Sequence, residues 1–248
     1  SQSAPSWEII NQWRQFYDVI EISDAISFAD DIDLLAIIHP SPLRPELLYQ
    51  IDQFVLKGRP VFVAVDPSSY VMRSQMPPQM MGRSQAASSN LPKLFKAWGI
   101  QYEADEVVGD LRYALQINTP ERAGQPYVPA FDLVAPAFNE RLRPMAGVEV
   151  MRMVEPGHLK LAEDSTLQIE ALMRTSAEAG TLFPMTVATS TPEQLARSLD
   201  LRGTPLTVGA LFRGPVQTAF PEGPPQPNNT EAEVSAPPES GLKESDGD

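Results

Sequence analysis

Two residues that can carry acid and base chemistry stand directly after two strongly apolar runs of the chain. His39 follows residues 32–38 and Asp66 follows residues 60–65, and each of the two is followed by a proline. In an open α/β sheet, ligands bind beyond the carboxyl ends of the strands, so both side chains are expected at that edge. A histidine beside a carboxylate can act as a general base with its orienting partner. The alternative is that each side chain only caps the loop backbone beside its proline.

The chain offers no complete catalytic or cofactor site around this pair. It has no cysteine and no Gly-x-Ser-x-Gly turn for a nucleophile, and its glycines form no phosphate-binding motif, so the chain itself is not expected to hydrolyse ATP. Its two histidines, His39 and His158, lack the spacing of zinc ligands. We therefore predict a protein that is not an enzyme and holds no metal or cofactor. A hydrolase, or a protein that binds a small ligand such as a glycan, at His39 and Asp66 is the alternative.

A polar segment with an unusual share of methionine follows the second apolar run. Residues 68–89 hold four of the nine methionines and no sustained hydrophobic period, which predicts a long surface loop or lid. Methionine adapts to protein surfaces and equally fills irregular gaps, so both roles stay open. The candidate ligand- or partner-binding residues are His39, Asp66, Ser68, Met72, Met76, Met80 and Met81.

A third hypothesis is a sugar-binding module, which would need exposed aromatic side chains gathered on one surface. The candidates are Trp98, Tyr102, Tyr113 and Tyr127, which otherwise belong to the core.

The elements that must position the candidate residues are those of a βαβ unit. Residues 32–38 form an apolar run typical of a strand buried on both faces, and residues 60–65 form a second. Between them a helix begins near Pro45 and ends at Gly58. Such a unit has parallel strands, so the predicted fold class is α/β with a mostly parallel sheet and helices on both faces.

The rest of the chain is less clearly patterned. Helices are expected near residues 7–17, 90–99 and 191–199, and short strands near residues 107–108, 113–117, 148–154, 167–173 and 206–212. Residues 120–144 are predicted to be irregular. Proline accounts for 25 of 248 residues, about twice the usual ~5 % share, which predicts long Pro-rich loops.

We expect a single α/β domain over residues 1–225, in which residues 110–175 could form an irregular subdomain. Residues 226–248 are rich in Pro, Ser and Glu and are expected to form an acidic linker or mobile tail. The net charge of −13 repels phosphate backbones, so nucleic acid is not an expected partner. No run of apolar residues reaches the ~20 needed for a membrane span.

Several motifs together resemble the ABC-type uncharacterised transport auxiliary family, which includes a gliding-motility-associated ABC transporter component. The likeness extends from about residue 7 to residue 225. The motifs are Asp33-Leu34-Leu35, His39-Pro40, Ile51-Asp52-Gln53-Phe54-Val55-Leu56-Lys57-Gly58, Val63-Ala64-Val65-Asp66-Pro67, Asn90-Leu91-Pro92, Ala97-Trp98-Gly99-Ile100, Val107-Val108-Gly109-Asp110, Thr175-Ser176, Phe212-Arg213-Gly214 and Thr218-Ala219-Phe220-Pro221.

The resemblance implies a non-catalytic binding or scaffolding domain on the extracytoplasmic, periplasmic side of a gliding-motility-like transport complex. It implies an ABC permease and a separate ATPase subunit as partners, and membrane attachment through segments absent from this chain. An envelope protein or a glycan is a further candidate partner. The fold that it implies is similar to flavodoxin or to class I glutamine amidotransferases. An amidotransferase activity is disfavoured, since that class relies on a cysteine.

Overall fold

The computed structural model describes residues 8–22, 31–74, 87–120, 122–225 and 241–245 of the 248-residue chain. The helices in this part are α1 (Glu8–Trp13), α2 (Pro45–Leu56), α3 (Tyr70–Ser74), α4 (Pro92–Trp98), α5 (Pro184–Thr189) and α6 (Pro192–Ser198), with short 3₁₀ helices η3 (Ala135–Ala137) and η4 (Arg143–Met145). The strands are β1 (Leu35–Ile38), β2 (Val61–Ala64), β3 (Ile100–Tyr102), β4 (Val107–Asp110), β5 (Ala114–Ile117), β6 (Gln125–Val134), β7 (Val150–Val154), β8 (Leu159–Leu161), β9 (Gln168–Arg174), β10 (Ala179–Leu182), β11 (Asp200–Leu201) and β12 (Thr207–Arg213).

The predicted βαβ unit is present. Strands β1 and β2 are parallel, with Leu35 opposite Val61 and Ile38 opposite Ala64. Helix α2 connects them and begins at Pro45, whose fixed φ suits the first helical turn. It ends before Gly58, which adopts a φ of 73°. The carboxyl ends of β1 and β2 therefore meet at one edge, as the position of His39 and Asp66 requires.

The prediction of a mostly parallel sheet, similar to that of flavodoxin or of the amidotransferases, is wrong. Of the strand pairs in the described residues, only β1 and β2 are parallel, and the others are antiparallel pairs in small separate sheets. The sheets have the strand orders β1-β2, β11-β10-β4, β12-β9, β3-β8 and β5-β6-β7. The physical reason is that a single βαβ unit specifies only its own two strands, and the short strands that follow it form antiparallel ladders.

The outer face of the β1–β2 pair also differs from the prediction. Phe62 is 47 % exposed and its register partner Ala36 is exposed too, so these strands are not buried on both faces. Helix α1 contributes the ring of Trp13, which meets Phe62 edge to face at 6.4 Å between centroids.

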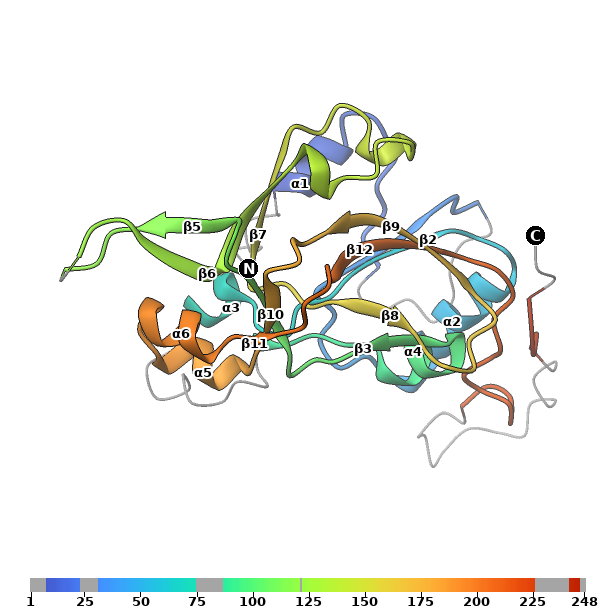
Figure 1. Cartoon of the computed structure of the whole chain (residues 1–248). Helices are drawn as coiled ribbons and strands as arrows, with labels where there is room; N and C mark the ends of the chain where they lie inside the picture. Colours follow the sequence, from blue (N-terminus) through green and yellow to red (C-terminus); the bar gives the residue numbers. More distant parts are fainter. Residues whose placement is uncertain (1–7, 23–30, 75–86, 121, 226–240, 246–248) are drawn as a thin grey trace, which may run out of the picture.

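Residues 120–144 are not irregular throughout, because ten of them form β6. Adjacent residues Ala114 and Leu115 of β5 pair with Phe131 and Tyr127 of β6. Residues 128–130 of β6 therefore form a bulge in the β5–β6 ladder. Pro129 lies in this bulge, where a strand tolerates a residue without an N–H donor. In Figure 1 the β5–β6 hairpin extends from one end of the molecule, whereas α2 and α4 lie at the other.

The helices expected near residues 191–199 and 90–99 are present as α6 and α4. Thr191 caps α6 and accepts a hydrogen bond from the backbone N–H of Gln194, whose side chain accepts one from the N–H of Thr191. Helix α4 ends at Gly99 with a φ of 76°, and a Cβ there would lie 2.5 Å from Ser165 Oγ.

Three clusters of buried side chains form the core. The largest joins β1 and α2 to α4 and includes Leu35, Phe54, Leu94 and Phe220. A second cluster is built around Phe131 and Leu133 of β6, and a third packs under α5 and α6. Elements far apart in sequence therefore pack together within each cluster.

A single buried carboxyl group ties the largest cluster together. Asp52 of α2 is fully buried. Its Oδ1 accepts hydrogen bonds from Trp98 Nε1 at 3.1 Å and from the Ala219 N–H at 3.0 Å. Its Oδ2 accepts one from the Thr218 hydroxyl at 2.5 Å. The carboxyl group thus joins α2, α4 and the segment after β12.

Replacing this carboxyl group should destabilise the fold strongly. Asp52→Ala leaves the indole N–H of Trp98 and the N–H of Ala219 buried without partners, and we expect it to lower the free energy of unfolding by about 3 kcal/mol or more. Urea unfolding followed by circular dichroism measures this. Glu163→Ala, which removes an exposed carboxylate, is the control. Equal losses in both variants would contradict the role of Asp52.

Candidate functional site

The candidate site forms where the chain leaves β2 and enters α3. Ser68 and Ser69 are buried, whereas none of the five residues of α3 is. The N–H of Ser69 donates to Ala87 O at 2.7 Å, which holds the start of this segment next to Ala87. Because α3 buries no apolar side chain, polar contacts must hold it in place.

Glu155 supplies those contacts from the end of β7. Its side chain is fully buried and its backbone has a φ of 51°, in the left-handed region. Its N–H donates to Pro129 O at 2.7 Å, which fixes this residue against β6. One carboxylate oxygen accepts a hydrogen bond from the Ser68 hydroxyl at 2.8 Å.

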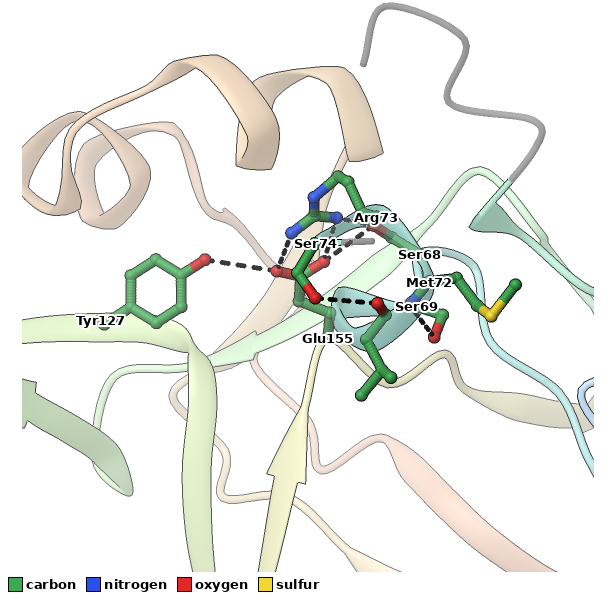
Figure 2. A network of polar contacts seen from close by, with 8 residues as sticks. Ser68, Ser69, Met72, Arg73, Ser74, Tyr127 and Glu155 are labelled. Carbon is green, nitrogen blue, oxygen red and sulfur yellow. Dashed lines mark hydrogen bonds and ion pairs between the residues drawn. The ribbon is translucent and has the colours of Figure 1, made fainter. Parts of the chain in front are cut away.

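Arg73 of α3 completes the arrangement (Figure 2). Its two terminal nitrogens donate to the two carboxylate oxygens of Glu155 at 2.6 and 2.5 Å, and one of them also contacts Ser68 Oγ. This two-point geometry is the strongest form of an arginine–carboxylate pair. The hydrogen bond to Glu155 raises the pKa of Arg73 further above its usual range. The guanidinium also lies 6.0 Å from the centroid of the Tyr70 ring.

Tyr127 approaches the same carboxylate from β6. Its hydroxyl donates to Glu155 Oε1 at 3.3 Å (Figure 2). Burial, followed by the charge of Glu155, raises the pKa of Tyr127 to about 12. The buried carboxylate therefore connects the β6–β7 sheet with α3.

This network joins Ser68 and helix α3 to the body of the protein. Both carboxylate oxygens of Glu155 accept hydrogen bonds from the Arg73 guanidinium. The Ser68 hydroxyl donates to that same carboxylate. What the arrangement can do is hold α3 rigidly on the body of the protein.

The structure brings the predicted pair His39 and Asp66 together. His39 Nδ1 lies 3.1 Å from Asp66 Oδ2, and the backbone of His39 adopts a φ of 45°. The N–H of Asp66 donates to Ser89 Oγ at 2.9 Å, and Ser89 returns a hydrogen bond from its own N–H to Asp66 O at 2.8 Å. Burial, followed by the charge of Asp66, raises the pKa of the Tyr102 hydroxyl.

The other predicted site residues have different positions. Ser68 belongs to the Glu155 network, and Met72 is half-buried on α3, where its N–H donates to Ser69 Oγ at 3.4 Å. Met76, Met80 and Met81 lie outside the described residues.

Sequence reasoning missed Glu155 and Arg73 as a pair. The turn Glu155-Pro156-Gly157-His158 was recognisable by its Pro-Gly step, but a glutamate before a turn carries no signal of burial. The partner is 82 residues away in the chain.

His158 of this turn lies in another polar cluster. It is 3 % exposed, and its Nε2 lies 2.7 Å from Glu106 Oε2. Burial of Glu106 opposes its ionisation, but the hydrogen bond with His158 and the charges of His158 and Arg202 outweigh burial and hold its pKa below the usual range. In the described residues, no group of three or more His, Asp and Glu side chains is placed to hold a metal ion.

The aromatic candidates for sugar binding do not form an exposed platform. Trp98 and Tyr102 are buried, and Tyr113 and Tyr127 are half-buried against two different core clusters.

Comparison with known families identifies the chain. The model of the ABC-type uncharacterized transport system family matches residues 1–248. This chain belongs to that family. As a member, it is an auxiliary component of an ABC-type transport system, and such systems work with membrane and ATPase subunits in general. Searches of the curated proteins and of the solved structures each gave no match.

The motifs on which the resemblance in the sequence rests converge in the structure. The Ile-Asp-Gln motif of α2, the Ala-Trp-Gly motif of α4 and the Thr-Ala-Phe motif after β12 meet at Asp52. The Val-Val-Gly-Asp and Thr-Ser motifs meet at Asp110, which is fully buried and accepts hydrogen bonds from the N–H and the hydroxyl of Ser176 at 2.7 and 2.8 Å. These motif residues therefore join separate elements of the fold of this auxiliary component.

No helix within the described ranges of the auxiliary component has the length and apolar character needed to cross a bilayer.

The Arg73–Glu155 pair should behave as a coupled unit. Glu155→Gln leaves the Arg73 guanidinium without its charge partner, and we expect a loss of about 3 kcal/mol in the free energy of unfolding. Adding Arg73→Met should recover part of that loss, because the uncovered charge is then gone. Urea unfolding of the two single variants and the double variant measures the coupling.

The exposed pair of Arg152 and Asp132, joined at 2.8 Å, is the control for this cycle. Arg152→Met should leave the free energy of unfolding within experimental error. Additive losses from Arg73→Met and Glu155→Gln would show that the buried pair is not coupled.

Tyr127 should make stability depend on alkaline pH. The folded protein holds the phenol proton more tightly than the unfolded chain, in which a tyrosine ionises near pH ~10. The contribution of Tyr127 is therefore complete below that pH and is lost as the pH rises towards the folded pKa of about 12. The difference in absorbance at 295 nm between the parent and Tyr127→Phe should titrate near that value. Tyr17→Phe, which removes a 70 % exposed residue, is the control. A Tyr127 difference that coincided with the Tyr17 difference would contradict the prediction.

Proposed function

We propose that the chain is a non-catalytic, extracytoplasmic binding and scaffolding domain of a gliding-motility-like ABC transport complex, with α3 as its docking element. Family membership supports the transport role. The single observation that carries the docking role is that α3 buries none of its own residues yet is held in place by an ion pair to a fully buried glutamate.

The use of the buried carboxyl groups supports a non-catalytic role. Asp52, Asp110 and Glu155 are fully buried, and each accepts several hydrogen bonds that join separate elements. A catalytic carboxylate needs at least one oxygen directed at a substrate. These three instead serve backbone N–H groups, hydroxyl groups and a guanidinium.

Helix α3 presents apolar side chains to solvent. Tyr70 is 57 % exposed and Val71 is 51 % exposed, on a helix that Arg73 fixes to Glu155. A rigid support lowers the entropic cost of binding, because the contact residues are already ordered before a partner arrives. An exposed tyrosine on such a support is a typical anchor of a protein interface. The partner that fits is an extracytoplasmic surface of the permease or of an envelope protein.

A second candidate function rests on His39 and Asp66. Their 3.1 Å contact has the geometry of a base with its orienting carboxylate. Among the described residues, however, no serine or threonine hydroxyl is bonded to the other ring nitrogen of His39. Turnover of p-nitrophenyl acetate that disappeared in His39→Ala would favour a hydrolase over the scaffold.

One experiment tests both the location and the docking element. The chain has no cysteine, so Tyr70→Cys introduces a single thiol at the exposed face of α3. A sulfonated, membrane-impermeant maleimide–benzophenone is added to intact cells that make the transport system, and the cells are then irradiated. We expect labelling before lysis, followed by cross-linking to the permease or an envelope protein.

Lys96→Cys, at an exposed position on α4, is the matched control. It should be labelled to the same extent in intact cells but should give no cross-link. Labelling of both cysteines only after lysis would refute the extracytoplasmic location. Efficient labelling of Tyr70→Cys with no cross-link beyond that of Lys96→Cys would refute α3 as the docking element.

A further inference from the structure

Residues 241–245 lie against the segment that follows β12 as an added strand. Gln217 and Glu244 form an antiparallel bridge. The Thr218 N–H donates to Lys243 O at 2.8 Å, and the Ser245 N–H donates to Val216 O at 3.2 Å. The described end of the chain therefore pairs with residues 216–218 through its backbone.

The side chain of Gln53 in α2 extends this pairing. Its Nε2 donates to Leu242 O at 3.0 Å, and its Oε1 accepts from the Leu242 N–H at 2.7 Å. A glutamine that both donates to and accepts from one residue's backbone replaces the neighbour that a strand would otherwise provide. Its neighbour Asp52 fixes Thr218 and Ala219 at the same time. Two adjacent residues of α2 thus build a site that holds an extended segment.

Along residues 241–245, the contacts restrict the choice of side chain little at the three middle positions and more at the first and last positions. Leu242 is 46 % exposed, and Lys243 and Glu244 are exposed as well. At Gly241, by contrast, a Cβ would lie 2.1 Å from Tyr49 Oη and 2.6 Å from Gln53 Oε1. At the other end, Ser245 Oγ accepts the Val216 N–H at 2.9 Å.

We propose that Gln53 and residues 216–218 form a strand-addition site for an extended peptide with the pattern Gly-x-x-x-Ser. In this proposal the chain's own residues 241–245 fill the site, and an extended segment of another protein with the same pattern replaces them. The backbone contacts provide affinity, and the small first residue and the final hydroxyl provide selectivity. The proposal does not depend on α3 or on the location of the protein.

The test uses the full chain and a fluorescent synthetic peptide with the sequence of residues 240–246. In the parent chain the tethered segment competes with the peptide at a high effective concentration. Gly241→Leu should weaken docking of the tethered segment, because the ends of the Tyr49 and Gln53 side chains would have to move away from the new side chain. We expect fluorescence anisotropy to show at least tenfold tighter binding to Gly241→Leu than to the parent.

Two controls make the result specific. Gln53→Ala combined with Gly241→Leu should reduce peptide binding at least tenfold, since both bonds to the backbone of residue 242 are lost. A peptide with leucine in place of its glycine should not bind any of the chains. Equal binding to all the chains, or no binding to a folded Gly241→Leu chain, would overturn the proposal.

Amide exchange of the parent chain, followed by NMR, tests whether the tethered segment fills the site even if Gly241→Leu does not fold. The amides of Leu242 and Ser245 should exchange at least tenfold more slowly in the parent than in Gln53→Ala. The amide of Ser176, which donates to Asp110, should be unaffected. Unprotected amides at residues 242 and 245 of the parent would overturn the proposal.

Discussion

The structure depends on how one carboxyl group in its interior is satisfied. Asp52 is fully buried, and a polar group removed from water costs several kcal/mol unless it is hydrogen-bonded. Its partners come from α4 and from the segment after β12, so its satisfaction requires both elements to be in place. Side chains near it also pack together. Phe220 packs edge to face on Tyr49, with 5.4 Å between the ring centroids, and the Lys93 ammonium lies 3.4 Å from the centroid of the Phe220 ring.

Local patterns predicted the local structure correctly. The apolar runs on either side of Pro45 and Gly58 predicted the βαβ unit, and helices were expected near residues 90–99 and 191–199, where α4 and α6 lie. These features follow from interactions between residues that are close in sequence. The sheet arrangement does not, because the strands are short and each pairs with a distant one. Strand β6 escaped prediction since its prolines read as loop residues, although one of them lies in a bulge.

The candidate site shows the same division. His39 and Asp66 could be placed together because both follow strands of one βαβ unit, and the parallel pairing brings those strand ends to one edge. The pair of Arg73 and Glu155 could not, because it depends on the meeting of α3 with the end of β7. Glu155 is buried only because α3 packs on the end of β7, and the residues next to Glu155 in the sequence do not indicate this burial.

The separation in sequence between Asp52 and its partners affects how the chain can fold during synthesis. Thr218 lies 166 residues after Asp52. A ribosome adds about 5 to 20 residues per second, so the βαβ unit waits on the order of ten seconds or more for the segment that completes its core. During that interval the buried face of α2 has no cover from Phe220. A nascent chain in this condition exposes apolar surface, which makes it a substrate for chaperones until the last motif has emerged.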